Sequence, residues 1–233
     1  MSVNIGVVSF PGSNCEYDVI EAIEHLGSNA SLVWHQDHDI SGFAAVVIPG
    51  GFAHGDYLRC GAIARFSPVM DAIAAFAAAG GPVLGVCNGF QVLTEAGLLP
   101  GALMRNAGLR FVCETTTVEL VSTSSALTGG LEVGTRLDLP INHGEGNYTC
   151  DAATLAEIEA NGQVVLRYTD NPNGSLNAIA GVANRAGNVV GLMPHPERAC
   201  DLMLGSADGV PLLSAFVASA GKFASRDIEL SRR

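Results

Sequence analysis

The sequence predicts one α/β domain over residues 1–233, with a doubly wound, mostly parallel sheet and antiparallel β additions in the second half. In the first half, apolar strand patterns are separated by helix-length segments, which is typical of parallel strands joined by right-handed crossovers. In the second half, strand patterns follow one another more closely. With 233 residues, 48% hydrophobic and 15% charged, the chain can bury a large core.

The first half alternates between strands and helices. Continuous apolar runs predict buried strands, over residues 3–10, 30–34, 44–48 and 82–86. Apolar residues at helical spacing predict helices, over residues 18–26, 68–79 and 90–96. Glycines at 80, 81 and 97 are stop signals for the last two helices. Such an order predicts that the strands end along one edge of the sheet, where open α/β sheets bind ligands.

The second half is richer in strands. We expect these over residues 109–122, 136–141, 164–169 and 178–193. The last run is broken at Ala186-Gly187-Asn188, which predicts a hairpin that returns the chain to the sheet edge. Residues 212–220 predict a closing helix. No repeat or linker divides the chain, so a single domain is expected.

The charge balance argues against several classes of partner. The chain has 23 acidic and 12 basic residues and a formal net charge of −11, so we expect it to bind neither nucleic acid nor anionic membranes. The N-terminus lacks a secretion signal, and no apolar run approaches about 18 residues, which predicts a cytoplasmic protein. No phosphate-loop motif is present, so no nucleotide cofactor is expected in this chain.

The most informative segment is Gly85-Val86-Cys87-Asn88-Gly89. Here a predicted strand enters a turn flanked by two glycines, from which a helix leaves. Such a turn lifts the residue at its centre out of the sheet, as in a nucleophile elbow. The helix N-terminus favours a thiolate at this position, which makes Cys87 a candidate nucleophile. A buried structural cysteine is the alternative interpretation.

A second segment, Pro194-His195-Pro196-Glu197, follows a predicted strand. The prolines favour extended backbone, in which residues two apart point to the same side. His195 could therefore act as a general base, with Glu197 orienting its ring. An ordinary solvated histidine in a surface turn is the alternative.

A third segment could stabilise an oxyanion. Gly50 and Gly51 follow the predicted strand at 44–48, and their backbone can approach a substrate closely. A glycine N–H there could pair with the Asn88 N–H to hold a tetrahedral intermediate. By itself, a Gly-Gly pair usually makes only a turn.

The other five cysteines, at positions 15, 60, 113, 150 and 200, do not form a short-spaced set. No pair has the spacing of a zinc site or a redox dithiol, so separate thiols and no metal are expected. Cys15 is the rival nucleophile, because it too follows a strand and a turn. Ser13 and Glu16, however, predict a helix capping box that explains this segment structurally. The remaining four are interpreted as packing residues.

Together these residues carry a family resemblance. Gly-Val-Cys-Asn-Gly-Phe-Gln at 85–91 and Pro-His-Pro-Glu at 194–197 resemble the signatures of class I (triad) glutamine amidotransferases. Further blocks, at residues 10–15, 50–59, 143–146, 171–175 and 193–198, resemble one branch of that class, the glutaminase subunits of phosphoribosylformylglycinamidine synthase in purine biosynthesis. Glu16, Tyr17, His54 and Asn142 depart from the pattern, but none belongs to the expected triad.

The resemblance implies a site with seven residues. Cys87 would be the nucleophile, His195 the acid and base, and Glu197 its partner. Gly51 and Asn88 would be the oxyanion donors. The glutamine substrate would lie near two further residues, Phe52 and Gln91.

The resemblance also implies partners. Ammonia would pass to a separate synthetase subunit, which binds ATP, magnesium and formylglycinamide ribonucleotide, with a small bridging subunit. Loop residues Asp56, Tyr57, Arg59 and Arg65 are candidates for that contact.

Two alternatives remain open from the residues. A stress-protein-type cysteine hydrolase could use a similar elbow, but such proteins usually draw their histidine from beside the cysteine, where this chain has Asn88. A non-catalytic binding subunit would not require a cysteine, a histidine and a carboxylate together. A glutaminase for a different ammonia acceptor is a narrower alternative.

Overall fold

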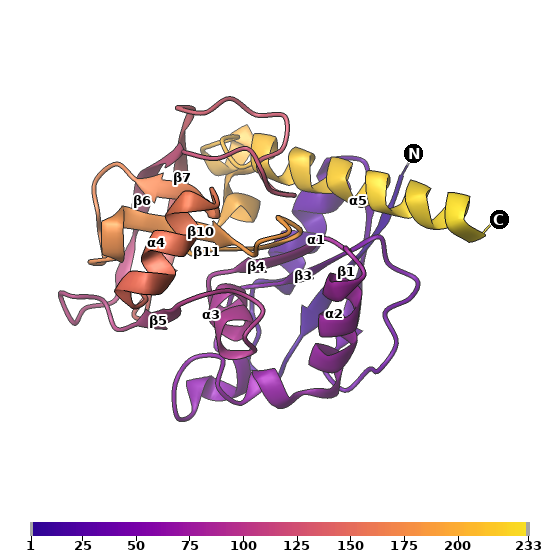
Figure 1. Ribbon diagram of the computed structural model, residues 1–233, viewed down its shortest axis with the longest axis horizontal. Coiled ribbons are helices and arrows are strands. Elements are labelled where there is room, and N and C mark those ends of the chain that lie inside the picture. The colour runs from indigo at the N-terminus through magenta and orange to yellow at the C-terminus, as the bar shows by residue number, and fades with distance from the viewer. Residues whose placement is uncertain (1, 232–233) are drawn as a thin grey trace.

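The computed structural model describes residues 2–231, with side chains through Arg226, and is built on a nine-stranded mixed sheet (Figure 1). The strand order is β2-β1-β3-β4-β11-β10-β9-β6-β7. Pairs from β2 to β11 are parallel, and pairs from β11 to β7 are antiparallel. The strands are β1 Asn4–Ser9, β2 Asn29–Trp34, β3 Ala45–Ile48, β4 Val83–Val86, β6 Val112–Leu120, β7 Arg136–His143, β9 Val164–Tyr168, β10 Ile179–Ala183 and β11 Val189–Leu192. The predicted fold class is confirmed.

Helices cover the sheet on both sides. They are α1 Glu16–His25, α2 Pro68–Ala78, α3 Asn88–Glu95, α4 Ala152–Ala160 and α5 Val210–Ser231. In Figure 1, α2 and α3 lie on one side of the strands and α5 on the other, and α1 packs on β1 and β2. A two-stranded ribbon joins β5 Ala102–Met104 to β8 Asn147–Thr149. The doubly wound arrangement predicted from alternating patterns is present in the parallel half.

Strand burial explains the two halves of the sheet. β3 and β4 are buried at every position, as parallel strands covered on both faces must be. In contrast, β6 exposes three successive residues and then alternates between buried and half-buried positions. One face of an antiparallel sheet can remain in water, so β6 can carry polar residues that would not be tolerated in β4.

Two glycines allow α3 to leave β4 abruptly. A Cβ on Gly89 would lie 1.9 Å from the backbone oxygen of Ile48, and one on Gly85 would lie 2.7 Å from the backbone of Gly89. Real side chains cannot make such contacts. The first turn of α3 therefore packs directly against β3 and β4, and this close packing fixes the turn between strand and helix.

Several local predictions are wrong or incomplete. The capping box is wrong: Ser13 Oγ accepts a hydrogen bond from Phe10 N (3.0 Å), and α1 begins only at Glu16 with no side-chain cap. Cys113 is exposed on β6, so it is not a packing residue. The sequence pattern does not predict helix α4, because only Ile158 in it is buried and its apolar pattern is therefore weak.

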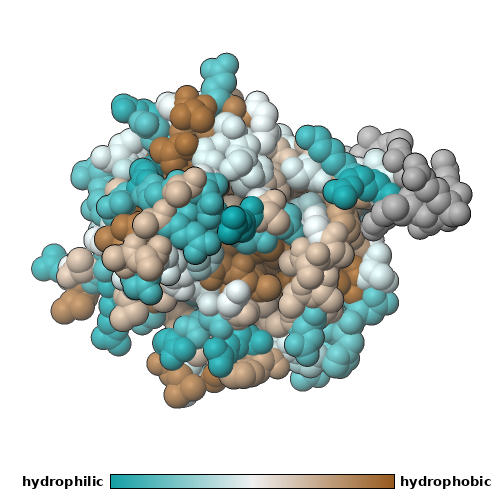
Figure 2. Space-filling view, in the orientation of Figure 1, coloured by the Kyte–Doolittle hydropathy of each residue, from teal (hydrophilic) through white to brown (hydrophobic). Residues whose placement is uncertain are grey.

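The surface carries no dominant apolar face in the view drawn. Figure 2 shows mostly hydrophilic or neutral residues there, with hydrophobic residues in separate clusters. Large exposed apolar side chains include Tyr57, Leu58 and Phe66 in the loop region before α2. Within residues 2–231, no helix combines the length and apolar character needed to cross a bilayer.

Candidate active site

Cys87 occupies the turn between β4 and α3. Its backbone has φ 49° and ψ −104°, an unusual conformation for a residue with a side chain. Its N–H donates to Leu192 O on the adjacent strand β11 (2.8 Å), which ties the turn to the sheet. Strained backbone of this kind is typical of functional turns, and Cys87 directly precedes the first turn of α3, whose N–H groups lack helical acceptors. The structure thus has the predicted elbow.

His195 and Glu197 follow β11, the parallel neighbour of β4. Their side chains are joined by a 2.6 Å contact between His195 Nδ1 and Glu197 Oε1, and both are almost completely buried. The backbone N–H of His195 donates to Pro140 O (2.8 Å) and holds the segment against β7. Because a carboxylate oxygen can only accept, Nδ1 carries the proton in this contact. His195 Nε2 has no hydrogen-bond partner among the described residues.

Gly50 is the point on which the predicted residues converge. A Cβ on Gly50 would lie 2.7 Å from His195 Cε1 and 3.5 Å from Cys87 Cβ. Only glycine leaves room for both side chains at this point. The structure therefore brings Cys87, His195 and Glu197 to one edge of the sheet, although the sequence separates the cysteine widely from the other two.

The surroundings of His195 favour its protonated form. Burial alone would lower the pKa of His195, but the Glu197 carboxylate and the neighbouring sulfurs of Cys87 and Cys15 raise it well above its usual value of 6.5. A protonated imidazole beside a cysteine favours the thiolate. In the structure, the Cys87 thiol is directed to Asn142 O at 3.6 Å.

The two proposed oxyanion donors belong to segments that are tied together. Gly51 has φ 141°, and a Cβ there would lie 2.8 Å from Asn14 N, so the position requires glycine. The Asn88 side-chain oxygen accepts from Ala53 N (3.0 Å), which connects the glycine loop, residues 50–53, to the elbow. The Asn88 N–H lies at the start of α3, where backbone donors lack helical acceptors.

The two predicted substrate-binding residues differ in their surroundings. The Phe52 side chain is exposed beside the glycine loop. Gln91 is buried, and its amide donates to Glu145 O (2.7 Å) and accepts from Asn88 Nδ2 (2.8 Å). Because both ends of the Gln91 amide are engaged, its visible role is to hold the loop at 143–146 near Cys87. A direct contact of either residue with glutamine stays a prediction.

Sequence reasoning missed the polar network that shapes this loop. His143 is buried between Asn106 Oδ1, at 3.2 Å from its Nδ1, and Asn173 Nδ2, at 3.5 Å from its Nε2. Asn106 also accepts from Gly146 N (3.0 Å). Burial and the nearby His195 lower the pKa of His143 to about 4. Residues 143–146 and 171–175 stand out in the sequence only as blocks of the resemblance, which predicts no role for His143 or Asn173.

Among the candidates for partner contact, Tyr57 is the most exposed, whereas Arg59 is paired with Glu95. Asp56 is connected to the elbow instead, since its carboxylate accepts from Asn88 Nδ2 (3.2 Å). Burial is the main reason that the pKa of Asp56 is raised. Of these loop residues, Asp56 alone contacts a residue of the expected site.

The fold and this edge of the sheet define a class. Residues 2–208 match the CobB/CobQ-like glutamine amidotransferase domain, and this match covers most of the chain. The chain therefore belongs to the glutamine amidotransferases. A putative GMP synthase component from Thermoplasma acidophilum has the same fold, with a TM-score of 0.68 at 15% identity over 98% of each chain.

More similar proteins narrow the family. The phosphoribosylformylglycinamidine synthase subunit PurQ of Synechococcus elongatus is 56% identical over 216 residues, which are 92% of this chain and 98% of the relative. The PurQ subunit of Rubrobacter xylanophilus is 56% identical over 218 residues, 94% of this chain and 99% of the relative. A chain in the structure of PurLQS from Thermotoga maritima aligns with a TM-score of 0.86 and 39% identity, over 94% and 99% of the two chains. Within its class, this chain belongs to the PurQ subunits of phosphoribosylformylglycinamidine synthase.

Proposed function

We propose that Cys87, His195 and Glu197 form the catalytic triad with which this chain releases ammonia from glutamine. The observation that supports it most is the orientation of His195: Nδ1 contacts Glu197 at 2.6 Å, and the other ring nitrogen, Nε2, is left without a partner among the described residues. That nitrogen is therefore available to exchange a proton with Cys87 and with the departing ammonia. The three residues are buried, which excludes bulk water from the reacting groups.

The reaction divides into two steps. The Cys87 thiolate attacks the side-chain amide carbon of glutamine, and the N–H groups of Gly51 and Asn88 hold the oxyanion. The tetrahedral intermediate collapses when the C–N bond breaks and the His195 imidazolium protonates the leaving ammonia. A water molecule, deprotonated by His195, then attacks the thioester, and glutamate leaves as the thiolate is restored. Glu197 stabilises the imidazolium in both steps.

The ammonia is used by a separate subunit. As a PurQ subunit, the chain works with the synthetase that converts formylglycinamide ribonucleotide to formylglycinamidine ribonucleotide, and with a small third subunit. We place ATP and magnesium on the synthetase, because this chain has no phosphate-loop motif. The match to the glutamine amidotransferase domain and to PurQ subunits favours this assignment over a stress-protein-type hydrolase.

The test uses the assembled complex and a glutamine analogue with a diazoketone in place of the amide. Peptide mapping is expected to place the added mass on Cys87, and Cys87→Ala should abolish synthesis from glutamine while synthesis from free ammonia continues. Cys150→Ala, which changes a half-buried thiol outside the site, is the matched control. Label on Cys15, or full glutamine-dependent activity in Cys87→Ala, would refute the assignment.

A further inference from the structure

A second thiol lies behind the His195–Glu197 pair. Cys15 is 3% exposed, and its Sγ is within 4.8 Å of both a His195 ring nitrogen and a Glu197 carboxylate oxygen. A Cβ on Gly50 would lie 3.1 Å from this sulfur and 2.7 Å from His195 Cε1, so the sulfur and the imidazole occupy the same small space. The proposed mechanism gives Cys15 no part in the reaction, and the capping role expected for its segment is absent.

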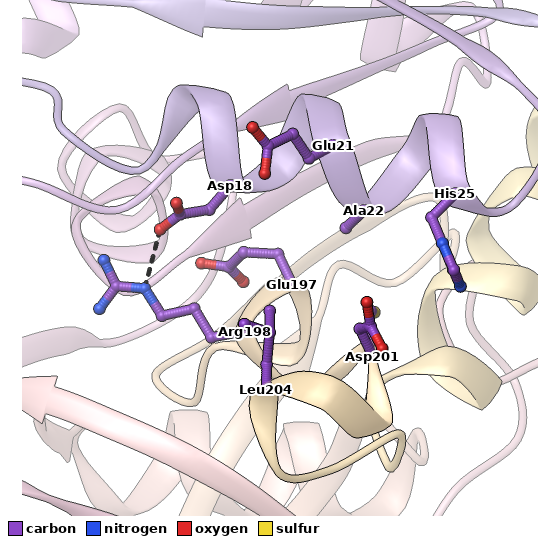
Figure 3. A pocket seen from close by; sticks show the side chains of 9 residues that line it. Asp18, Glu21, Ala22, His25, Glu197, Arg198, Asp201 and Leu204 are labelled. Carbon is purple, nitrogen blue, oxygen red and sulfur yellow. Dashed lines mark hydrogen bonds and ion pairs between the residues drawn. The ribbon is translucent and has the colours of Figure 1, made fainter.

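Arg198 holds this sulfur in place. Its Nη2 donates to Cys15 Sγ (3.1 Å), and its Nε donates to Asp18 Oδ2 on α1 (2.9 Å). Figure 3 shows the Arg198–Asp18 pair at one side of a cavity of about 480 Å³, with the Glu197 side chain beside it. Burial alone would lower the pKa of Arg198, but Cys15, Asp18 and Glu197 raise it, so the guanidinium stays charged.

The sulfur of Cys15 is held by polar contacts on two sides. Its S–H points to Asn14 Oδ1 (3.4 Å), and its sulfur accepts from Arg198. The backbone N–H of Cys15 donates to Gly50 O (3.3 Å), which ties the same residue to the glycine loop. A bound cation would have to lie next to the Arg198 guanidinium, so a metal site formed by Cys15, His195 and Glu197 is disfavoured.

Only one of the two carboxylate oxygens of Glu197 has a hydrogen-bond partner among the described residues. Its Oε1 contacts His195, but its buried Oε2 has no hydrogen-bond partner among the residues with described side chains. A buried carboxylate needs compensation for its lost hydration. The positive charge of Arg198, the residue that follows it, interacts with Glu197 and supplies part of this compensation.

We propose that Cys15 and Arg198 are positioning residues for the glutaminase reaction. Arg198, anchored on Asp18, fixes the Cys15 sulfur against the His195 ring and places a positive charge next to Glu197. The imidazole is thereby held between Cys15 and Cys87 with Nε2 free. This inference depends on the proposed triad and extends it to residues that themselves touch neither glutamine nor the reacting atoms.

The pH profile separates this role from a purely structural one. The groups that face His195 are Glu197, Cys87, Cys15 and His143, and Arg198 adds a positive charge behind them. Removing that positive charge should raise the pKa of His195, because the negative charges around it are then less compensated. The basic limb of the profile of kcat/KM for glutamine should therefore move to higher pH in Arg198→Met. A folding defect would instead lower kcat/KM at every pH and leave the pH of the limb unchanged.

The variants are Arg198→Met, Arg198→Lys, Cys15→Ala and Cys15→Ser, each assayed in the whole complex with glutamine and with ammonia. We expect Arg198→Met and Cys15→Ala to lower kcat for glutamine by about 10²-fold, the loss typical of a misplaced catalytic group, with little change in KM or in ammonia-dependent synthesis. Arg198→Lys should restore the position of the basic limb and part of the rate. Cys15→Ser, which keeps an acceptor for Arg198, should restore most of the rate.

Arg185→Met is the control, because Arg185 is an exposed arginine paired with Glu157, away from the site. Wild-type kcat in Arg198→Met and Cys15→Ala, with the basic limb of Arg198→Met unmoved, would overturn the inference. An equal loss of glutamine- and ammonia-dependent synthesis in all four variants would overturn it too. If the positioning role fails in this way while Cys87→Ala is inactive with glutamine, the proposed triad still stands. Activity in Cys87→Ala would instead refute the triad itself.

Discussion

Val86 and Leu192 are register partners on the adjacent parallel strands β4 and β11. Each is the last residue of its strand, so the chain segments that follow them leave the sheet side by side. One segment carries Cys87, and the other carries His195 and Glu197. This single pairing explains how residues from distant parts of the sequence meet at the carboxyl edge of the sheet, where open α/β folds bind their ligands.

The carboxylate of Glu197 should determine the protonation of His195. In Glu197→Gln, the largest raising influence on the pKa of His195 is lost while burial remains, so that pKa should fall. We expect kcat with glutamine to drop by about 10²- to 10⁴-fold, by analogy with loss of the carboxylate in a serine triad. The basic limb of the kcat/KM profile should move to lower pH, measured in the whole complex; a limb at the wild-type position would contradict this.

Replacing Gly50 or Gly89 by alanine should have different effects, a loss of activity in the first case and a loss of stability in the second. In Gly50→Ala, the new Cβ meets the side chains of His195 and Cys15, which can shift, so the protein should fold but lose about 10²-fold in glutamine-dependent rate. In Gly89→Ala, the new Cβ would lie 1.9 Å from Ile48 O, a backbone atom that cannot move easily. We therefore expect a destabilisation of about 3 kcal/mol or failure to fold.

Thermal unfolding followed by circular dichroism, together with labelling of Cys87, distinguishes the two glycine variants. Gly42→Ala is the control, since its Cβ would contact no atom within 4 Å and its backbone is not left-handed. A stable, fully active Gly50→Ala would mean that the imidazole is not confined at this point.

The isolated chain should be a poor glutaminase. In the free chain the Cys87 thiol contacts Asn142 O (3.6 Å), and this contact competes with transfer of its proton to His195. We expect assembly with the synthetase to raise glutamine hydrolysis by about 10²-fold, the lower end of the usual contribution of a general base. Steady-state glutamate release by the free chain and by the complex is the measurement. Equal rates would show that the free subunit is already competent.

The sequence predicted those features that depend on local patterns. Apolar runs located β1, β3 and β4, and glycines around residue 87 indicated the elbow, because backbone sterics leave few alternatives there. The contacts of Cys15 could not be predicted, since they depend on how α1 packs against the segment after β11. Helix α4 buries little and so left a weak apolar pattern, although Asp151, which caps it through Thr154 N (2.7 Å), was an available signal.

His143 should make the fold less stable in mild acid. Because burial and the nearby His195 lower its pKa to about 4, the folded chain leaves His143 neutral between pH 6.5 and 4, whereas the unfolded chain takes up a proton there. The unfolding free energy therefore falls as the pH falls, by about 1.4 kcal/mol per pH unit and roughly 3 kcal/mol across the window. His195 adds little slope over most of this range, since its raised pKa keeps it protonated in the folded chain and the unfolded chain also protonates it below its usual value of 6.5.

His143→Gln removes the titrating group, so its unfolding free energy should depend less steeply on pH over this window, whatever its stability at neutral pH. Urea unfolding at a series of pH values measures the slope directly, and His38→Gln, at an exposed histidine, should keep the wild-type slope. Carboxyl groups that titrate in the same range contribute equally to all three proteins. Identical slopes for wild type and His143→Gln would mean that the folded protein accommodates a charged imidazole, which the contacts with Asn106 and Asn173 argue against.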